Sequence, residues 1–475
     1  MKDIHEHNIL TEVGQLLINY RESQKSSERL LDYQKPSELA AQLDLDKDTK
    51  DDWQALFQWV EHYLKHSVRT GHPGFVNRMW AEPNLPSIIG EFVATVAQTS
   101  GCTYESAPVA VLIEKYMFAT ILELVGFEQG EAQMTTGSSN ANMIALLAAR
   151  NNINQSFKQH GMRNSPELVA FVSADAHYSL DKAANVIGLG TNNLIKVPVN
   201  SAGEMDPAEL SALLVEATSK GQQPFFVCGT AGTTVRGAYD SIPALLTLRE
   251  QYGFWLHIDA AWGGGALLDP DLKARFMPEV EQVNSLTWDF HKMLGSSLMC
   301  NILMFNSDQH HLAQSCGAGD GSYLFRETDA DTIIDPGLSS LQCGRRVDAL
   351  KWFLDWKFYG QQGLAKRVTN FLSLAEYIEN KINESDVLEL ITPRQSFNLC
   401  FRYNDNNTTD LDSLNQAIRT TLYQQGKSLV GMAWINDTMV LRWLSSNPAL
   451  SHSSIDNFIQ ELESAGKDIA SSGIA

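Results

Sequence analysis

The sequence has few positive charges and no basic cluster. Its 475 residues include 36 Lys and Arg against 56 Asp and Glu, which gives a formal net charge of −20. Proteins that bind nucleic acids or anionic membranes need clustered Lys and Arg to contact phosphate groups. The charge pattern therefore argues against a nucleic-acid partner and against binding to a membrane surface.

Cysteines are also scarce, and their spacing fits neither a zinc site nor a disulfide framework. The six stand singly along the chain, at Cys102, Cys228, Cys300, Cys316, Cys343 and Cys400. Such scattered cysteines are typical of reduced thiols, and we expect no metal site. The first residues lack the basic-then-apolar order of a signal peptide, and no apolar run approaches membrane-spanning length. These absences predict a cytoplasmic protein with no membrane partner.

The chain contains no internal repeat or low-complexity tract, and its length allows two or three domains. Residues 1–70 have the apolar spacing of helices, with a break near Pro36, and predict an arm that packs on a neighbour. From about residue 131, strands, helices and glycine-bearing turns alternate, as in a mostly parallel sheet with crossover helices. We predict a helical arm over 1–70, a large α/β domain over 71–365 and a small α+β domain over 366–475.

Two successive predicted strands each end in a residue that can do chemistry. The run 254–258 leads to Asp259, and the run 285–288 leads to Lys292, which lies 33 residues beyond Asp259. Ligands of open α/β sheets bind outside the carboxyl ends of the strands. A lysine can hold pyridoxal phosphate (PLP) as a Schiff base while a carboxylate keeps its pyridine nitrogen protonated. Each residue alone is more often a helix cap or part of a solvated turn, but together they favour a PLP site.

Small residues follow Asp259 immediately. The segment 260–265 contains two alanines and three glycines around one tryptophan. Little side-chain bulk is expected where a backbone must approach a flat ligand closely. We therefore predict that this segment lies against the cofactor.

Three further strand ends add candidate ligands. Ser138 and Ser139 stand in a Gly-Ser-Ser turn before the helical run 143–150, where hydroxyls, backbone N–H groups and the helix dipole suit a phosphate, although a plain N-cap is the simpler interpretation. His177 follows a strand and could stack on a planar cofactor or assist proton transfer. Thr230 stands in another turn of small and hydroxyl residues. Five strand ends are thus predicted to converge on one site.

Together these motifs closely resemble the group II PLP-dependent amino-acid decarboxylases of fold type I. This family includes the glutamate, cysteine-sulfinate, aspartate and aromatic amino-acid decarboxylases. The resemblance covers roughly residues 70–470 and rests on the motifs HYS, TAGTT, HIDAAWGGG and HK, which occur in family order. It implies these roles: Lys292 as Schiff-base lysine, Asp259 as pyridinium partner, His177 stacked on the ring, Ser138, Ser139 and His291 on the phosphate, and Thr230 and Ala261 lining the ring.

Within the family, three segments resemble the glutamate and cysteine-sulfinate branch more than the aromatic branch. They are TYESAP at 103–108, QCGRRVD at 342–348 and SNP at 446–448. Arg442 matches the arginine that in this branch binds the substrate α-carboxylate, a task that suits a guanidinium fork. The resemblance implies a homodimer whose subunits share the active sites, with a primary amine and carbon dioxide as products.

The substrate pocket departs from the glutamate decarboxylases. In those enzymes two segments resemble FNQLS and TNMFTYE, and a Ser of the first and an Asn of the second serve the distal carboxylate. This chain has Trp80, close to Asn77, in place of that Ser, and Ser100 in place of that Asn. Cysteine-sulfinate decarboxylases also place an aromatic residue and a serine there. The resemblance therefore favours cysteine sulfinate or aspartate as the substrate, with glutamate possible.

Other departures leave alternatives open. Asp289 lies where animal relatives have asparagine, and DFHK resembles some bacterial diaminobutyrate decarboxylases, so L-2,4-diaminobutyrate is an alternative substrate. Arg78 and Arg236 are either anion partners or members of structural ion pairs. The loop tyrosine proposed as the Cα proton donor in relatives falls near Ala330 or Asp331 here.

The reaction type has alternatives as well. A lysine and an aspartate do not by themselves distinguish a decarboxylase from an aminotransferase or another PLP lyase on the same fold. A degenerate paralogue that only binds ligands is a further alternative. Arg442 and the HYS motif favour decarboxylation, and the intact Lys292, Asp259 and His177 favour an enzyme.

Overall fold

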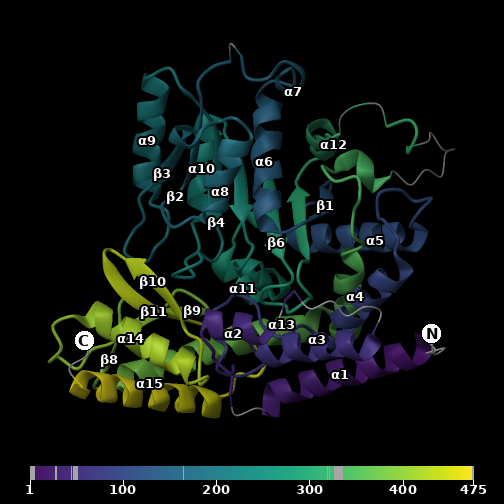
Figure 1. Cartoon of the computed structure of the whole chain (residues 1–475). Coiled ribbons are helices and arrows are strands. Elements are labelled where there is room, and N and C mark those ends of the chain that lie inside the picture. The colour runs from purple at the N-terminus through teal and green to yellow at the C-terminus, as the bar shows by residue number, and fades with distance from the viewer. Residues whose placement is uncertain are drawn as a thin grey trace. The chain divides into compact units, whose positions relative to one another are not determined.

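The structure is a computed structural model that describes residues 6–26, 29–43, 45–46, 52–163, 165–317, 319, 321–325 and 335–472. It divides into two compact units (Figure 1), one over Pro83–Asn370 and one that combines Met1–Glu82 with Phe371–Ala475. The three-domain division predicted above stays a prediction. No helix in the described part of the chain is long and apolar enough to cross a membrane.

The unit 83–370 contains most of the α/β elements. Its helices and strands are α4 (Leu85–Ala97), α5 (Pro108–Val125), β1 (Glu131–Thr135), α6 (Ser138–Ile153), α7 (Phe157–His160), β2 (Leu168–Ser173), α8 (Ser179–Val186), β3 (Leu194–Val197), α9 (Pro207–Ser219), β4 (Gln223–Thr230), α10 (Ile242–Tyr252), β5 (Trp255–Asp259), α11 (Pro270–Phe276), β6 (Ser285–Asp289), β7 (Asn301–Phe305), α12 (His311–Cys316) and the first part of α13 (Ala349–Glu384).

The strands of this unit form one seven-stranded sheet in the order β1-β7-β6-β5-β4-β2-β3. The five strands β3, β2, β4, β5 and β6 are parallel. Strand β7 is antiparallel to both β6 and β1, so β1 runs in the same direction as β6. This topology confirms the predicted mostly parallel sheet, and it places the carboxyl ends of β1, β2, β4, β5 and β6 at one edge.

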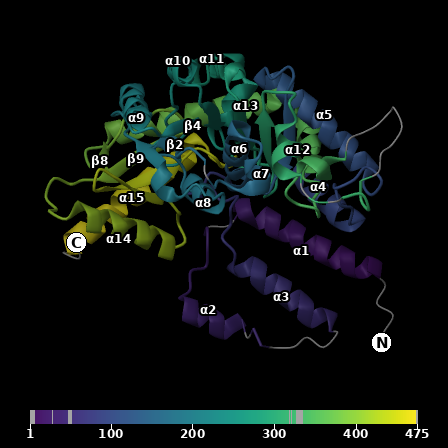
Figure 2. The same cartoon turned by 90° about the horizontal axis from the view of Figure 1, so that it is seen from above.

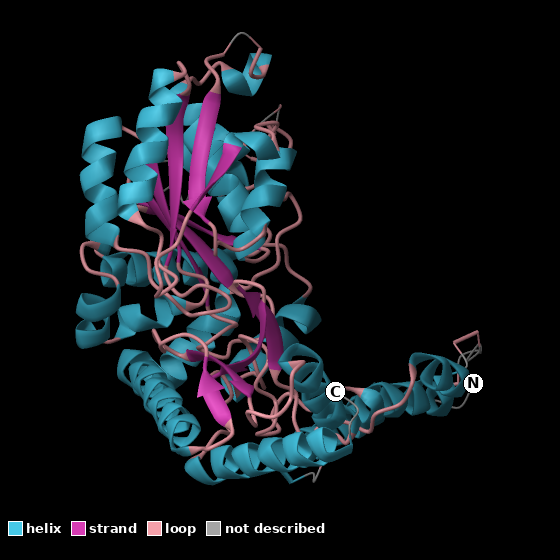
Figure 3. Cartoon of the chain, turned by 90° about the vertical axis from the view of Figure 1, so that its left-hand side faces the viewer, coloured by secondary structure: helices cyan, strands magenta, loops and turns pink. Residues whose placement is uncertain are grey.

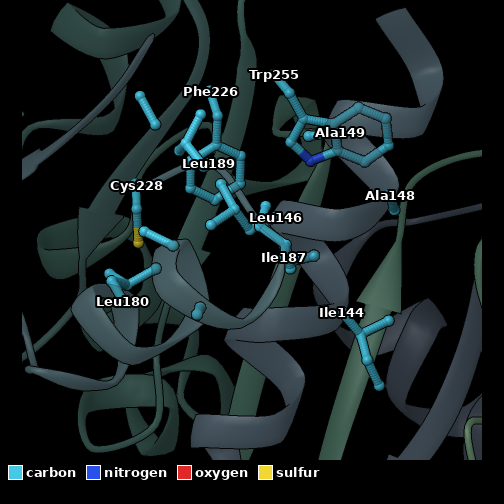
Figure 4. Packing of buried hydrophobic residues seen from close by; sticks show 14 of the residues in the cluster. Ile144, Leu146, Ala148, Ala149, Leu180, Ile187, Leu189, Phe226, Cys228 and Trp255 are labelled. Atoms are coloured by element: carbon cyan, nitrogen blue, oxygen red, sulfur yellow. The ribbon is translucent and has the colours of Figure 1, made fainter. Parts of the chain in front are cut away.

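Helices cover both faces of the sheet. Figure 2 shows α6 and α8, which pack together, on one side of the strands, and α9 and α10, also packed together, on the other. On the α6 side, Ile144 and Leu180 pack with Phe226 of β4 in a buried apolar cluster (Figure 4). Along β2, Ala170 and Val172 belong to this cluster, and Phe171 between them is equally buried. Burial on both faces explains the continuous apolar runs of these strands.

The second unit carries a four-stranded antiparallel sheet in the order β10-β11-β9-β8 (Figure 3). Its elements are α1 (Glu6–Ser26), α2 (Pro36–Leu43), α3 (Trp53–His66), the remainder of α13, β8 (Leu388–Leu390), β9 (Asn398–Tyr403), α14 (Leu411–Gln424), β10 (Gly431–Ile435), β11 (Thr438–Leu444) and α15 (His452–Ser472). Backbone contacts join early and late residues: the Leu30 N–H donates to the Gly426 carbonyl at 2.7 Å, and Phe75 pairs with Leu429.

Candidate active site

Five strands deliver functional residues to one edge of the seven-stranded sheet. Because these strands run in one direction, the residues at their carboxyl ends lie at the same edge, where α/β proteins bind ligands. These residues are Ser138 after β1, His177 after β2, Thr230 at the end of β4, Asp259 at the end of β5, and Asp289 with Lys292 at and after the end of β6. The structure thus brings together most of the predicted site residues.

Lys292 forms an ion pair with Asp289, three residues before it. The lysine Nζ lies 3.0 Å from Asp289 Oδ2, and the side chains are 21% and 3% exposed. The Asn301 amide donates to the other carboxylate oxygen at 2.7 Å. Burial by itself would raise the pKa of Asp289, but the charges of Lys292 and His291, together with these hydrogen bonds, hold that pKa below its usual range. The unusual Asp289 is therefore an ionised partner of the lysine.

Asp259 is buried and held at both oxygens. Its Oδ2 accepts a hydrogen bond from Asn142 Nδ2 at 2.8 Å, and its Oδ1 accepts one from the Ala261 N–H at 3.1 Å. Only 4% of the residue is exposed. A carboxylate fixed in this way presents its charge in one direction.

His177 is a neutral imidazole close to these charged groups. The pKa of His177 lies below its usual value, mainly because the ring is buried. The Asp259 carboxylate opposes this shift, and the Lys292 ammonium adds to it. The Ser179 N–H donates to His177 Nδ1 at 3.3 Å, so the ring proton of the neutral form sits on Nε2. The preceding Asp175 forms an ion pair with Arg236, with Nε and Oδ2 3.1 Å apart. Of the two roles considered for Arg236, an anion partner or a member of a structural ion pair, the structure shows the second.

Ser138 is the first residue of α6 and directly follows Gly137, the N-cap residue of this helix. Gly137 has φ 115°, and a Cβ there would lie 2.5 Å from Met299 Cε, so this turn requires glycine. The Ser138 hydroxyl lies 3.0 Å from Asn301 Nδ2. Ser139 is exposed in the same first turn. The first amides of a helix have no partner within it, so this turn offers donors suited to a phosphate.

Two further predicted ligands lie beside these groups. The Thr230 N–H donates to Asp240 Oδ2 at 2.7 Å, while its buried hydroxyl has no hydrogen-bond partner among the described residues. His291 is 4% exposed, and its Nδ1 lies 2.8 Å from the Cys300 carbonyl oxygen. A buried hydroxyl without a partner costs free energy unless a ligand satisfies it. The donor set of this edge therefore fits PLP.

The glycines after Asp259 have a different explanation from the predicted one. A Cβ at Gly263 would lie 2.4 Å from the Tyr239 hydroxyl, and one at Gly264 would lie 2.5 Å from the Trp288 indole. These glycines admit neighbouring side chains of the protein. Close packing within the protein is therefore a sufficient reason for Gly263 and Gly264, and the approach of this segment to the cofactor stays a prediction.

Ser100 belongs to the same unit as the PLP residues. Its hydroxyl accepts a hydrogen bond from the Arg345 N–H at 3.2 Å. The Arg345 guanidinium pairs with buried Glu114, with Nη2 and Oε1 2.6 Å apart. Ser100 is therefore tied to the QCGRRVD segment, which is itself anchored by a buried ion pair.

The other predicted substrate residues lie in the second unit. The Arg442 Nη2 donates to the Asn77 carbonyl at 2.5 Å, which joins β11 to the segment after Phe75. The Trp80 ring packs against Phe75, with centroids 5.3 Å apart, and belongs to a small apolar cluster. The Arg78 side chain is exposed, and its carbonyl accepts from the Ser446 hydroxyl at 2.8 Å. The structure brings Arg442, Asn77 and this cluster together within one unit.

Several residues that contact the site were not predicted. Asn142 and Asn301 donate to the two carboxylates, and His257 contacts Asn142. His257 stands inside the motif HIDAAWGGG and Asn142 lies shortly after Ser138 and Ser139, but nothing in the sequence assigned either residue a partner. Ala330 and Asp331, where the loop tyrosine of relatives falls, lie outside the described residues. Among the described residues, no group of three His, Cys, Asp or Glu side chains could hold a metal ion.

A lysine and a carboxylate at neighbouring ends of parallel strands, beside a serine-bearing helix N-terminus, define a PLP-dependent enzyme of fold type I. The chain belongs to the pyridoxal-dependent decarboxylases: the family described as the pyridoxal-dependent decarboxylase conserved domain matches residues 36–404. It is therefore a PLP-dependent carboxy-lyase, which confirms the predicted family, cofactor and enzyme class.

Solved structures agree with this assignment. The apo form of mouse CSAD, a cysteine sulfinate decarboxylase, is 30% identical, with a TM-score of 0.92 over 97% of this chain and 98% of that one. The glutamate decarboxylase domain of a Vibrio parahaemolyticus diaminobutyrate-pyruvate transaminase and L-2,4-diaminobutyrate decarboxylase is 22% identical, with a TM-score of 0.84 over 97% and 95%. Oryza sativa TDC, solved with PLP and tryptamine, is 21% identical, with a TM-score of 0.90 over 99% of each chain.

Proposed function

We propose that this enzyme removes the α-carboxylate of a small acidic L-amino acid, with cysteine sulfinate or aspartate favoured and glutamate possible. The observation that carries the proposal is the 30% identity to mouse CSAD over nearly the whole of both chains. The solved neighbours from Vibrio parahaemolyticus and Oryza sativa share only 22% and 21% of their residues with this chain. The residue types at two positions, an aromatic residue at Trp80 and a serine at Ser100, resemble those of cysteine-sulfinate decarboxylases and support the same class of substrate.

The residues at the sheet edge would hold PLP. Lys292 would bind the cofactor covalently, Asp259 would keep the proton on its pyridine nitrogen, and His177 would stack on the ring. The remaining proposed contacts are Ser138, Ser139 and His291 with the phosphate, and Thr230 and Ala261 with the ring. Bound PLP supplies the electron sink that accepts the electron pair of the breaking bond between Cα and the carboxylate.

The chain's own residues would orient the substrate and move the proton. Arg442 would hold the α-carboxylate through its guanidinium fork, which fixes the bond that breaks. The buried Asp259 carboxylate would stabilise the positive charge on the ring during bond cleavage. His177 would return a proton to Cα, because its neutral ring carries its proton on Nε2 while Nδ1 accepts from the Ser179 N–H.

A basic substrate, L-2,4-diaminobutyrate, is the second candidate. It rests on Asp289, which the chain shares with some bacterial diaminobutyrate decarboxylases by resemblance. Asp289 is 2% exposed, and its carboxylate accepts a hydrogen bond from the Asn301 amide at 2.7 Å, a contact that does not involve the cofactor. A buried aspartate with this partner is poorly suited to attract a substrate amine, which favours the acidic class.

The experiment that tests the substrate measures carbon dioxide release by the purified, PLP-loaded protein. The panel contains cysteine sulfinate, aspartate, glutamate, cysteate, L-2,4-diaminobutyrate and aromatic amino acids. We expect kcat/KM for a short acidic substrate to exceed that for diaminobutyrate by at least about tenfold, a difference of about 1.4 kcal/mol in transition-state binding. Preference for diaminobutyrate or an aromatic amino acid would overturn the proposal, and keto-acid formation would indicate an aminotransferase.

The proposed assembly is a cytoplasmic homodimer with shared active sites. All six cysteines are free thiols, which suits a reducing compartment. Helix α4 supports the dimer, because its exposed apolar residues recur at helical spacing: Leu85, Ile89, Phe92, Val93 and Val96. Val96 is 84% exposed. Such a stripe on a helix surface is typical of a protein interface.

Charge on this stripe should dissociate the dimer. We expect the wild-type protein to sediment at twice the 52.7 kDa mass of one chain, and the double variant Phe92→Glu/Val96→Glu to sediment as a monomer, because buried unpaired carboxylates oppose association. Val215→Glu is the matched control, since Val215 is an exposed apolar residue on α9 at 56% exposure. A monomeric wild type, or a double variant that dimerises like the control, would contradict the proposed interface.

A further inference from the structure

A chain of buried polar groups leads from the interior of the sheet to Asp259. The Trp255 Nε1–H donates to the Ser285 hydroxyl at 2.8 Å, and that hydroxyl lies 2.8 Å from His257 Nδ1. His257 Nε2 lies 3.0 Å from Asn142 Oδ1, and Asn142 Nδ2 donates to Asp259 Oδ2 at 2.8 Å. Ser285, His257 and Asn142 are fully buried. Strands β5 and β6 and helix α6 each contribute members.

The acceptors and donors of this chain can be assigned from its ends. The ionised Asp259 can only accept, so Asn142 must present its NH2 group to Asp259 and its carbonyl oxygen to His257. His257 must then carry its proton on Nε2. Burial lowers the pKa of His257 to about 4, so the ring is neutral and its Nδ1 must accept. The Ser285 hydroxyl therefore donates to His257 while it accepts from Trp255.

This order leaves the Asn142 amide one orientation. If His257 lost its Nε2 proton, or were replaced by an apolar residue, the Asn142 oxygen would have no donor in the chain. The amide could then turn and present its oxygen to the Asp259 carboxylate, where two acceptors repel each other. A second contact supports the present orientation, because Asn142 Nδ2 also lies 3.0 Å from the Ser179 hydroxyl. The imidazole is itself confined, with the Phe226 ring stacked at 5.9 Å between centroids.

We infer that His257 and Asn142 are positioning residues that fix the Asp259 carboxylate in the direction needed to hold the proton on the pyridine nitrogen of PLP. The inference rests on the proposed role of Asp259. Neither residue needs to touch the cofactor, because both act through the hydrogen bond to Oδ2. Ser285 sets the tautomer of His257 by donating to its Nδ1. It is the residue farthest from Asp259 that we expect to influence the orientation of the carboxylate.

The test combines kinetics with a direct readout of the pyridine proton. His257→Leu and Asn142→Leu should lower kcat about 10- to 100-fold with KM changed less than about threefold, the size of effect seen when groups that orient active-site ligands are removed. In protein loaded with PLP labelled with 15N in the ring, the pyridine 15N resonance should move towards the unprotonated position. His257→Gln, whose amide can still donate to Asn142, should restore much of both properties.

Controls separate positioning from folding. Gln133→Leu removes another buried amide in the same unit, one with no hydrogen-bond partner among the described residues, and should leave the resonance and kcat unchanged. Ser285→Ala, a small change that tests the chain if the leucine variants do not fold, should shift the resonance in the same direction by less. Wild-type resonance and kcat in the foldable variants, with Asp259→Asn inactive, would overturn this inference alone. An Asp259→Asn protein with wild-type resonance and kcat would instead overturn the proposed role of Asp259.

Discussion

Replacement of Lys292 by alanine should abolish decarboxylation, with kcat lowered at least about 10⁴-fold, because no other group can hold PLP covalently at this position. Borohydride reduction followed by mass spectrometry should find the cofactor attached to the Lys292 peptide of the wild type and to no peptide of the variant. The alanine variant also leaves Asp289 without its cation at 3.0 Å in a buried site. Part of any loss could then come from a disturbed fold.

Lys292→Arg separates these two effects. Arginine keeps a positive charge beside Asp289 but cannot bind PLP covalently, so its thermal midpoint should stay close to the wild type while its kcat falls as far as that of the alanine variant. Lys220→Ala is the matched control, because Lys220 is an exposed lysine in the same unit that also pairs with a carboxylate, with Nζ 2.5 Å from Glu216 Oε1. Retention of about 1% or more of wild-type kcat by Lys292→Arg would exclude Lys292 as the covalent ligand.

Replacement of Asp259 by asparagine should lower kcat about 10³-fold, equivalent to about 4 kcal/mol of transition-state stabilisation. A neutral amide cannot balance the charge of a protonated pyridine nitrogen, and the buried site, 4% exposed, offers water little access to replace it. The ring 15N resonance should move to the unprotonated position in the same variant. The measurements are steady-state kinetics with the best substrate of the panel and the 15N spectrum of the loaded protein.

The control for this variant is Asp181→Asn, a partly exposed aspartate of the same unit that pairs with Lys196 at 2.8 Å. Exposed pairs of this kind contribute at most about 1 kcal/mol, and kcat should not change. A fall of less than about tenfold for Asp259→Asn, with the resonance still at the protonated position, would show that another group protonates the pyridine ring.

The chemistry of the sheet edge could be predicted from local sequence. In a parallel α/β sheet the strand direction sends every carboxyl end to the same edge, so Asp259, Lys292, His177 and Ser138 could be grouped without coordinates. The apolar runs before them marked the strands, and the small-residue turns marked the ends. These features depend on neighbours in the chain and on a topology that the alternation of elements already indicates.

The partners of charged groups could not be predicted in this way. Asp289 was unexplained until the turn after β6 placed Lys292 Nζ 3.0 Å from it, and Arg236 had two interpretations until it was found beside Asp175. The glycines at 263–265 were interpreted as ligand-facing. The structure shows that neighbouring segments of the protein leave no room for a Cβ at these three positions. The Asp289 contact depends on the conformation of the turn after β6. The other two outcomes depend on side-chain packing between distant segments.

The sequence by itself determined the class of this protein, because covalent attachment of PLP and protonation of its ring need a lysine and a carboxylate at successive strand ends, and both are visible in the chain. Only the tertiary structure decided how these groups are held. Asn142 meets Asp259 across 117 residues of chain, and His257 meets Asn142 across 115. Hydrogen bonds over such separations exist only after helix α6 has packed on strand β5, so no local pattern can specify them.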